Sequence, residues 1–366
     1  MNENHLTGTE VRSLVNKYID SEGIVNSTQA ILDSGLVTKL TGFKVYPGKV
    51  SDSIFGGRFS YTKNGETYEC ENPPLNTIDG TPIRIMVRTQ RISTHDLNRG
   101  EIPFKDQILA SNHHHMRRLV SHAIGTSQIN VPGLEDNSVV IAAENLTQIP
   151  FENVLRAYMA KSSTPTSLFQ AWSKGEKEFA SHKINKEWFP NCKLPYVMDT
   201  PSTKSDDHDE TLSPKELFSR GICTPEQYMN IRNNSLMAFG IVSGFLRGRG
   251  IILVDTKTEH GINREGEIVS QDELYTMDSS RFWLLGDYMD PKRISYNTDP
   301  MSYSKEFARE FSKGEKGYTN EERMKISMRY IIGIQHLLDK KFQLDIRQRD
   351  ERVVTGLQKV VEELSL

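Results

Sequence analysis

Asp255, Lys257 and Glu259 alternate with two threonines directly after a run of four aliphatic residues. The aliphatic run predicts a β-strand, and alternate residues of a strand share one face. A returning strand through Asp272 would add a carboxylate to this face, opposite Lys257 if residues 263–266 form the turn. Glu259 and Asp272 then suit a divalent cation such as Mg²⁺, and the lysine suits a phosphate.

The same charges also fit a solvated sheet face. Salt bridges on such a face contribute roughly 0 to 1 kcal/mol each and are common. For the segment alone this alternative carries equal weight, because charge runs usually face solvent. Only the surrounding sequence can distinguish a metal and phosphate site from a solvated sheet face.

The elements that must position these residues are strand-rich at first and mixed afterwards. The patterns predict helices over 6–34, 108–123, 151–160, 225–248, 320–341 and 348–363, and strands over 36–60, 83–89 and 139–143. The glycines of RGRG at 247–250 are predicted to end a helix before the charged strand. We therefore predict an α+β fold with a β-rich lobe over 1–145, a mixed lobe over 146–366 and a cleft between them.

Composition argues against several classes of protein. The 366 residues include 45 basic and 48 acidic side chains, so the net charge of −3 does not indicate nucleic-acid binding. No apolar run approaches the roughly 20 residues of a membrane-spanning helix, and the polar start MNENHLTGTE does not resemble a signal peptide. The three cysteines lack C-x-x-C spacing, which indicates a reducing compartment. We expect a cytoplasmic protein with small-molecule partners.

Three blocks of sequence carry a more specific signal. DTKTEHG and DELYTMDSSRFW, within 255–283, follow the patterns D-x-K-x-E-x-G and D-E-x-x-T-x-D-S-S-R-x-W. LPYVMDTPSTKSDDHDETLS at 194–213 follows L-P-x-P-I-F-T-P-S-T-K-A-x-x-H-D-E-x-I-S, and IPFENVLRAYMAKSS at 149–163 follows I-P-x-E-x-V-x-R-x-Y-x-x-G-S, with Lys161 in place of the glycine. Three such blocks in order are far more specific than one motif. The chain thus resembles the SAICAR synthetase family of purine biosynthesis.

The N-terminal third resembles this family less closely. PGKVSDSIF, TQRISTHD and IPFKDQIL resemble the family segments G-K-V-R-D, T-D-R-I-S-x-x-D and I-P-x-K-G-x-x-L. Ser51, Gln90 and Asp106 replace the arginine, the acid and the glycine of these segments. A long stretch rich in turn residues, 56–82, lies between the first two.

The resemblance implies both a fold and a reaction. It implies two lobes, of which the smaller antiparallel lobe covers ATP. It also implies that ATP phosphorylates the carboxylate of carboxyaminoimidazole ribonucleotide (CAIR), and that the amine of L-aspartate attacks the acyl phosphate to give SAICAR, ADP and phosphate. ATP, CAIR and L-aspartate are thus the expected partners and Mg²⁺ the expected cofactor, while homo-oligomer formation stays open.

The resemblance also assigns site residues. Glu259 and Asp272 are expected to bind Mg²⁺, and Lys49, Lys257 and Glu259 to bind ATP. Lys257 and Asp255 are expected closest to the chemistry. The expected substrate ligands are Arg156, Ser162, Lys204, Asp209, Arg281, Ser93 and Asp96.

Simpler interpretations exist for single residues. Lys49 alone fits a surface lysine at a turn, and Arg156 fits a helix-surface ion pair with Glu152. The segment TPSTKSDDHDE alone fits a polar loop. The histidines at 113–115 are consecutive, so on a helix they point in different directions and cannot all bind one metal ion.

Two other functions remain as alternatives. A kinase-like phosphotransferase would also use a lysine and two metal-binding carboxylates, but the sequence lacks the H-R-D and D-F-G motifs. A catalytically degenerate ATP-binding regulatory protein would account for Ser51, Gln90 and Asp106. The metal and phosphate residues are retained, which argues against it, because a non-catalytic binding module has no need of the full set. These residues are Lys257, Glu259, Asp272 and Arg281.

Overall fold

The computed structural model describes residues 5–21, 26–63, 65–94, 97–204, 210–296, 298–314 and 316–366. Contacts divide the chain into two compact units. The first comprises Met1–His114, Ser127–Asn145 and Ala308–Leu366, and the second comprises His115–Thr126 and Leu146–Phe307. This division groups the C-terminal segment with the N-terminal residues, whereas the sequence analysis grouped it with residues 146–307.

The first unit is built around an antiparallel sheet with the strand order β1-β2-β5-β8. Its strands are β1 (Tyr46–Pro47), β2 (Ser51–Phe55), β3 (Gly57–Lys63), β4 (Glu66–Asn72), β5 (Ile83–Arg88), β6 (Arg91–Thr94), β7 (Leu97–Glu101) and β8 (Val140–Glu144). The strands β3 and β4 form one separate hairpin, and β6 and β7 form another. The stretch rich in turn residues, 56–82, therefore contains a two-stranded hairpin.

Helices pack on this sheet and on one another. They are α1 (Gly8–Asp20), α2 (Thr28–Asp33), the 3-10 helix η1 (Thr38–Leu40), α3 (Lys105–Leu119), α10 (Asn320–Leu338) and α11 (Arg349–Glu363). The helix α1 packs on α10, and α11 packs on β8 and α2. The approach of α11 to β8 is close enough to require Gly356, since a Cβ there would lie 2.7 Å from a methyl group of Val140. One apolar core unites this part, with buried side chains from α2, β5, β8 and α11.

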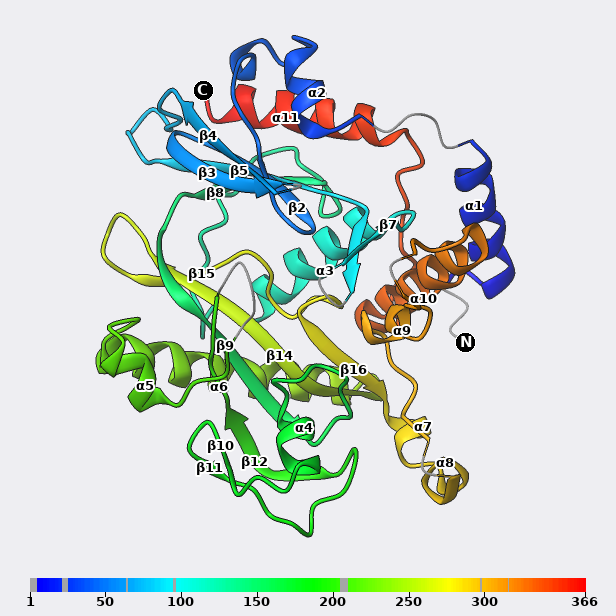
Figure 1. Cartoon of the computed structure of the whole chain (residues 1–366). Coiled ribbons are helices and arrows are strands. Elements are labelled where there is room, and N and C mark those ends of the chain that lie inside the picture. The colour runs from blue at the N-terminus through cyan, green and yellow to red at the C-terminus, as the bar shows by residue number, and fades with distance from the viewer. Residues whose placement is uncertain are drawn as a thin grey trace. The chain divides into compact units, whose positions relative to one another are not determined.

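The second unit is built around a longer antiparallel sheet with the order β12-β9-β14-β15, in which β16 also pairs with β14 and β13 with β9. The strands are β9 (Thr147–Tyr158), β10 (Glu178–Phe179), β11 (His182–Lys183), β12 (Lys193–Asp199), β13 (Ser202–Thr203), β14 (Ile251–Ile262), β15 (Ile268–Gln271) and β16 (Ser280–Leu284). Figure 1 shows the long strands β9 and β14 side by side, as their register requires. The helices are α4 (Leu168–Ser173), α5 (Pro214–Ser219), α6 (Pro225–Arg247), α7 (Leu285–Tyr288) and α8 (Pro291–Tyr296), and α9 (Glu306–Arg309) follows at the end of the unit.

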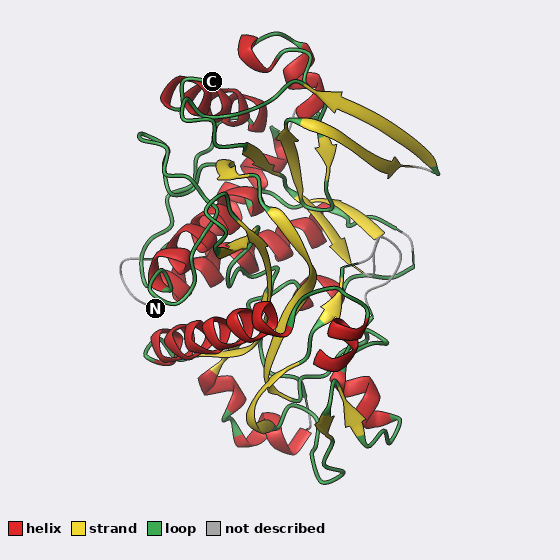
Figure 2. Ribbon diagram, turned by 90° about the vertical axis from the view of Figure 1, so that its left-hand side faces the viewer, coloured by secondary structure: helices red, strands yellow, loops and turns green. Residues whose placement is uncertain are grey.

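The long helix α6 covers β14, β9 and β15. It begins with a capping box, in which the side chains of Thr224 and Gln227 each bind the backbone of the other, and Pro225 occupies its first turn. It ends at Arg247 with Gly248 as its C-cap, as the RGRG segment predicts, and β14 starts three residues after the cap. Helices thus lie beside antiparallel strands in each unit (Figure 2), and the predicted α+β class is confirmed.

Most of the predicted elements are present, but the helix predicted over 151–160 is wrong. This segment is the strand β9, which pairs with both β12 and β14. Glu152 and Arg156 are four residues apart, a spacing that suits one face of a helix and equally one face of a strand. Pairing on both sides decides for the strand.

The predicted register of the β14 hairpin is also wrong by one residue. Glu259 lies opposite Gln271, and the turn closes between Asn263 and Glu267. Asp272 therefore follows the end of β15 instead of lying opposite Lys257, and it has a left-handed backbone with φ of 58°. The position of Asp272 is therefore set by the backbone after β15 and not by the strand ladder.

Three further expectations concern single residues and segments. The histidines do point apart: His113 contacts Gln128, His114 contacts Asp136 and the ring of His115 lies on Phe245. The three cysteines are free thiols. Among the helices that the structure describes, none is both long and apolar enough to cross a membrane.

Candidate active site

The charged face of β14 forms the centre of the second unit's polar cluster. The register places Arg156 of β9 opposite Asp255 and Glu152 opposite Glu259. Arg281 of β16 also lies opposite Asp255, on the other side of β14. Three neighbouring strands therefore present charges to one surface, which confirms the predicted alternation along β14.

Asp255 lies between two guanidinium groups. Arg281 donates from Nε to both carboxylate oxygens at 2.9 and 3.0 Å, and Nη1 of Arg156 lies 3.4 Å from Oδ2. The side chains of Arg156 and Arg281 keep 16% and 14% of their surface exposed, so both are accessible to a ligand. Two cations that share one anion carry a net positive charge, which suits a phosphate group.

Further contacts orient the two arginines. Nε of Arg156 donates to Thr200 Oγ1 at 3.0 Å, and Nη1 of Arg281 donates to the carbonyl of Lys161 at 2.9 Å. The side chain of Lys161, which stands in place of the family's glycine, turns to Asp299 at 2.9 Å. Ser162 follows directly, so the predicted residues Arg156, Ser162 and Arg281 belong to one neighbourhood.

Lys257 is held from two directions. Its Nζ donates to Glu152 Oε1 at 2.6 Å, and its backbone N–H donates to the carbonyl of Ser279 at 2.9 Å. Ser279 belongs to a turn that Thr276 closes through its hydroxyl, with Glu273 as a buried acceptor at 2.6 Å. The side chain of Lys257 is 46% exposed, whereas that of Glu152 is 8% exposed. The backbone of Lys257 is thus held by Ser279 and its ammonium group by Glu152, while the side chain stays open to solvent.

Glu259 contacts Lys204 of the segment 200–209, which we call the TPSTK loop. Nε2 of Gln271 lies 3.4 Å from Oε2 of Glu259. Burial would raise the pKa of Glu259, but the charges of Lys204 and Lys257 outweigh burial and lower the pKa below its ordinary value. Glu259 is therefore ionised at neutral pH, as a metal ligand must be.

Glu259 fits a hard divalent cation, since its carboxylate is ionised and partly accessible. Asp272 lies one residue beyond Gln271, the strand partner of Glu259. Within the described residues, no group of three or more His, Cys, Asp or Glu side chains is arranged around a common point. A cation here would therefore complete its coordination with water and ligand oxygens, which is ordinary for Mg²⁺.

A buried cluster anchors the start of the TPSTK loop. Asp199, which stands where the family pattern has phenylalanine, accepts hydrogen bonds from Tyr228 and from Nε of Arg232 at 2.8 Å. His182 lies 3.3 Å from the same carboxylate. Burial would raise the pKa of Asp199, but these three partners outweigh it and hold the pKa at about 2. The next residue, Thr200, is the one that binds Arg156.

The first unit contains two of the predicted site residues. Lys49 is exposed in the turn between β1 and β2, and Ser93 lies in β6 opposite Asn98. The turn closes through a hydrogen bond of 3.0 Å from the N–H of Gly48 to the carbonyl of Ser51. A Cβ on Gly48 would overlap that carbonyl oxygen, so the position requires glycine. Asp96 and Asp209 lie outside the described residues.

Three residues of the site escaped the sequence analysis: Glu152, Thr200 and Gln271. Glu152 was interpreted as a partner of Arg156 on a helix, whereas it binds Lys257 across a strand pair. Its signal was present, because Glu152, Val154 and Arg156 alternate as one face of a strand would. Thr200 lies in the TPSTK motif, but its contact with Arg156 was not predicted. Gln271 carries no such signal, and only pairing between distant segments brings it beside Glu259.

His260 occupies the opposite face of β14 and is 3% exposed. Neither ring nitrogen has a hydrogen-bond partner in the part of the chain that the structure describes. Burial lowers the pKa of His260 to about 4, although the charge of Glu259 opposes this shift. The folded protein therefore keeps this ring neutral where an unfolded chain protonates it.

Acid is accordingly expected to destabilise the second unit through His260. As the pH falls from about 6.5 to about 4, only the unfolded chain binds the proton, so the free energy of unfolding falls by roughly 3 kcal/mol. His260→Leu should flatten this dependence, and His122→Gln, at an exposed position, should leave it unchanged. Urea unfolding followed by tryptophan fluorescence at pH 7, 5.5 and 4.5 measures it. Equal slopes for wild type and His260→Leu would contradict the assignment.

Comparisons with known proteins point to one family. The model of the SAICAR synthetase family matches residues 75–325. The chloroplastic phosphoribosylaminoimidazole-succinocarboxamide synthase of Arabidopsis thaliana is 34% identical over 62% of this chain and 53% of its own length. The corresponding synthase of Bacteroides fragilis is 28% identical over 78% of this chain and 90% of its own length. The match thus spans about half of the plant relative and most of the bacterial one.

Solved structures share the fold. The SAICAR synthase of Saccharomyces cerevisiae, complexed with SAICAR, superposes with a TM-score of 0.64 at 20% identity, over 82% of this chain and 97% of that one. A second SAICAR synthase gives a TM-score of 0.65 at 20% identity, over 88% of this chain and all of that one. Because the family model spans more than half of the sequence, this chain belongs to the SAICAR synthetase family.

Proposed function

We propose that this protein joins L-aspartate to the carboxylate of CAIR with the consumption of ATP, and releases SAICAR, ADP and phosphate. One observation carries the proposal. The charged face of β14 combines an accessible ammonium group, an ionised carboxylate and a pair of guanidinium groups within one sheet. These are the groups that phosphoryl transfer to a phosphate-bearing substrate needs.

The first step would transfer a phosphoryl group. A carboxylate oxygen of CAIR attacks the γ-phosphorus of ATP, the bond from phosphorus to the bridging oxygen breaks, and ADP leaves. Lys257 would neutralise the charge that develops on the transferred group, and Lys49 would bind ATP phosphates. Glu259 and Asp272 would hold Mg²⁺, which would supply positive charge against the phosphates.

The second step would form the amide bond. The aspartate nitrogen attacks the acyl carbon, the carbon–oxygen bond to phosphate breaks, and the nitrogen loses a proton. A free carboxylate lacks a leaving group, which is why the acyl phosphate must form first. The protein's part is positioning and charge neutralisation, since no protein nucleophile enters either step.

The remaining residues would bind substrate. Arg156, Ser162 and Arg281 would hold the ribonucleotide phosphate, with Asp255 fixing the separation of the two guanidinium groups. Lys204 and Asp209 of the TPSTK loop would bind CAIR or aspartate, and Ser93 and Asp96 are further candidates for the same substrates. Lys204 and Glu259 form an ion pair. When a cation binds Glu259, Lys204 would therefore have to leave Glu259 and bind a ligand instead.

The test is ADP release by the full chain with ATP, Mg²⁺ and CAIR, with and without L-aspartate. We expect release and SAICAR formation only when all components are present, and loss of both when EDTA removes Mg²⁺. Glu259→Gln should raise the Mg²⁺ concentration for half-maximal rate roughly tenfold, because it removes one anionic ligand. Glu267→Gln, an exposed change in the turn between β14 and β15, is the matched control.

Each outcome separates the candidate functions. ADP release that needs aspartate supports the ligase. ADP release that needs CAIR but not aspartate would indicate a phosphotransferase instead. Nucleotide binding with no product in any mixture would favour a regulatory protein. A cytoplasmic location and the oligomeric state stay predictions, which fractionation and light scattering test.

A further inference from the structure

Two residues that depart from the family motifs, Gln90 and Asp106, meet in one buried cluster. Asp106 and Gln90 have no exposed surface, and Arg352 of α11 is 5% exposed. Arg352 donates from Nη1 to Asp106 Oδ2 at 3.0 Å, and Gln90 donates from Nε2 to the hydroxyl of Tyr18 at 2.9 Å. Burial raises the pKa of Tyr18, and the charge of Arg352 acts against this rise. The departures therefore belong to one arrangement with α1 and α11.

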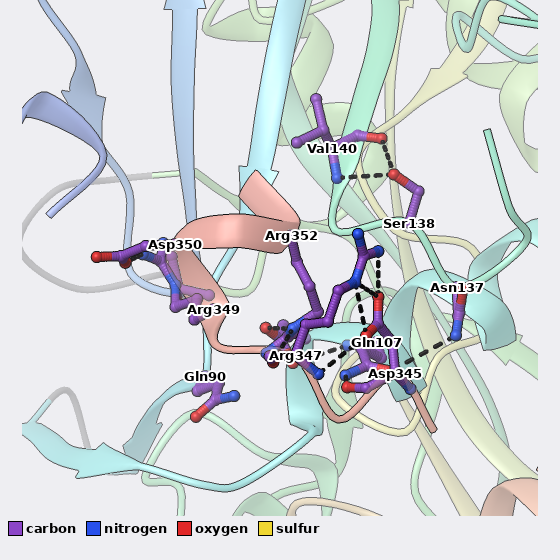
Figure 3. Close-up of polar contacts among 12 residues, drawn as sticks. Gln90, Gln107, Asn137, Ser138, Val140, Asp345, Arg347, Arg349, Asp350 and Arg352 are labelled. Carbon is purple, nitrogen blue, oxygen red and sulfur yellow. Dashed lines mark hydrogen bonds and ion pairs between the residues drawn. The ribbon is translucent and has the colours of Figure 1, made fainter. Parts of the chain in front are cut away.

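Asp106 also binds the backbone within the first turn of α3. Its Oδ1 accepts the backbone N–H of Gln107 at 2.9 Å, in the first turn of α3. The neighbouring Gln107 exchanges hydrogen bonds of 2.8 Å with the backbone of Asp345, just before α11 (Figure 3). Breaking a buried ion pair is costly, because it leaves one charge buried without its partner. The start of α11 is thus fixed on the start of α3.

A second route from α11 leads to the turn that contains Lys49. Arg349 lies one turn before Arg352 (Figure 3), and its Nη2 lies 3.5 Å from Thr28 Oγ1. The Thr28 hydroxyl donates to Asp52 Oδ2 at 2.6 Å, and Asp52 binds Nη2 of Arg91 at 2.5 Å. All of these side chains belong to the first unit.

Both routes converge on Arg91. Its guanidinium donates to the carbonyl of Gly48 at 2.8 Å, at the base of the turn. Its own carbonyl accepts Nζ of Lys105 at 3.1 Å, and Lys105 directly precedes Asp106. The helices α2 and α11 and the Gly48 turn lie outside residues 75–325, whereas Arg91 and Lys105 lie within them. Segments outside the family match thus support a residue inside it.

We propose that α11 is a positioning element for nucleotide binding. Through Thr28 and Asp52 on one route, and Asp106 and Lys105 on the other, it holds Arg91 and thereby the carbonyl of Gly48. The Gly48 turn then keeps the conformation that presents Lys49 to ATP. This inference rests on the proposed function, because that proposal assigns Lys49 to the phosphates.

The first test is Thr28→Val, which removes a hydroxyl at nearly constant volume. The Kd for ADP with Mg²⁺, and KM for ATP, should rise about tenfold, because Asp52 loses a charge-assisted hydrogen bond. KM for CAIR and aspartate should stay within about twofold. The control is Lys359→Gln on α11, where the lysine pairs with Glu363 at 2.5 Å, away from both routes.

The second test restores the family pattern in steps. Asp106→Gly alone should raise the Kd for ADP, because it leaves Arg352 buried without its anion. Adding Gln90→Asp should recover most of the affinity. Gln90 and Arg352 contact the same Tyr18 hydroxyl, so a carboxylate at position 90 replaces the carboxylate lost at position 106. A merely structural role would lower the melting temperature without this pattern of affinities.

The outcomes are separable from those of the ligase assay. ADP titration needs no turnover, so a wild type that binds ADP without making SAICAR would end the ligase proposal and leave this one testable. Unchanged ADP affinity in folded Thr28→Val and Asp106→Gly would overturn the positioning role. Raised Kd values in both, with recovery in the Gln90→Asp/Asp106→Gly double variant, support it.

Discussion

Lys257→Met is expected to lower kcat/KM for SAICAR formation by about 10²- to 10³-fold. The ammonium group is fixed by Glu152 at 2.6 Å and is 46% exposed, so it can meet the transferred phosphoryl group without moving far. A preorganised charge of this kind stabilises the transition state more than the bound substrate, because it meets charge that develops only there. The loss should therefore fall mainly on kcat.

The control is Lys193→Met, an exposed lysine on β12 of the same sheet, which should keep nearly full activity. Removing Lys257 also leaves Glu152 with little exposure and without its cation, which costs stability. The double variant Lys257→Met/Glu152→Gln removes that charge and should recover the melting temperature but not the activity. Retention of activity within about threefold in Lys257→Met would remove the residue from the mechanism.

Asp255→Asn is expected to destabilise the second unit by about 3 kcal/mol. Its carboxylate holds two guanidinium groups, of Arg156 and Arg281, whose side chains are only 16% and 14% exposed. Without the carboxylate these two cations repel each other where water screens them poorly. Inorganic phosphate should restore part of the loss, because it binds the same pair in the folded state.

Tryptophan fluorescence during urea unfolding measures this effect selectively. All three tryptophans, at 172, 188 and 283, belong to the second unit. The control is Glu210→Gln, which breaks an ion pair with Arg220 whose side chains are 57% and 43% exposed, and it should change stability by less than about 1 kcal/mol. If Asp255→Asn were no more destabilising than this control, the shared carboxylate would not hold the cluster together.

The sequence by itself determined the family, the α+β class and the charged strand face. Alternation along β14 is local, since a strand's geometry places every second residue on one face whatever it packs against. The helices α6, α10 and α11 were predictable for the same reason, because the 3.6-residue period acts within the segment, and α6 and α10 also begin with capping boxes. The three motif blocks named most of the site residues because they keep their order and spacing.

Only the tertiary structure decided which partners these residues have. The segment with Glu152 and Arg156 fits either a helix or a strand, and pairing with two neighbours made it β9. A one-residue difference in turn length moved Asp272 off the ladder and put Gln271 beside Glu259. The meeting of Gln90 and Asp106 with Tyr18 and Arg352 joins residues more than 200 positions apart. Local patterns fix which face a side chain occupies, but contacts between distant segments fix what it meets there.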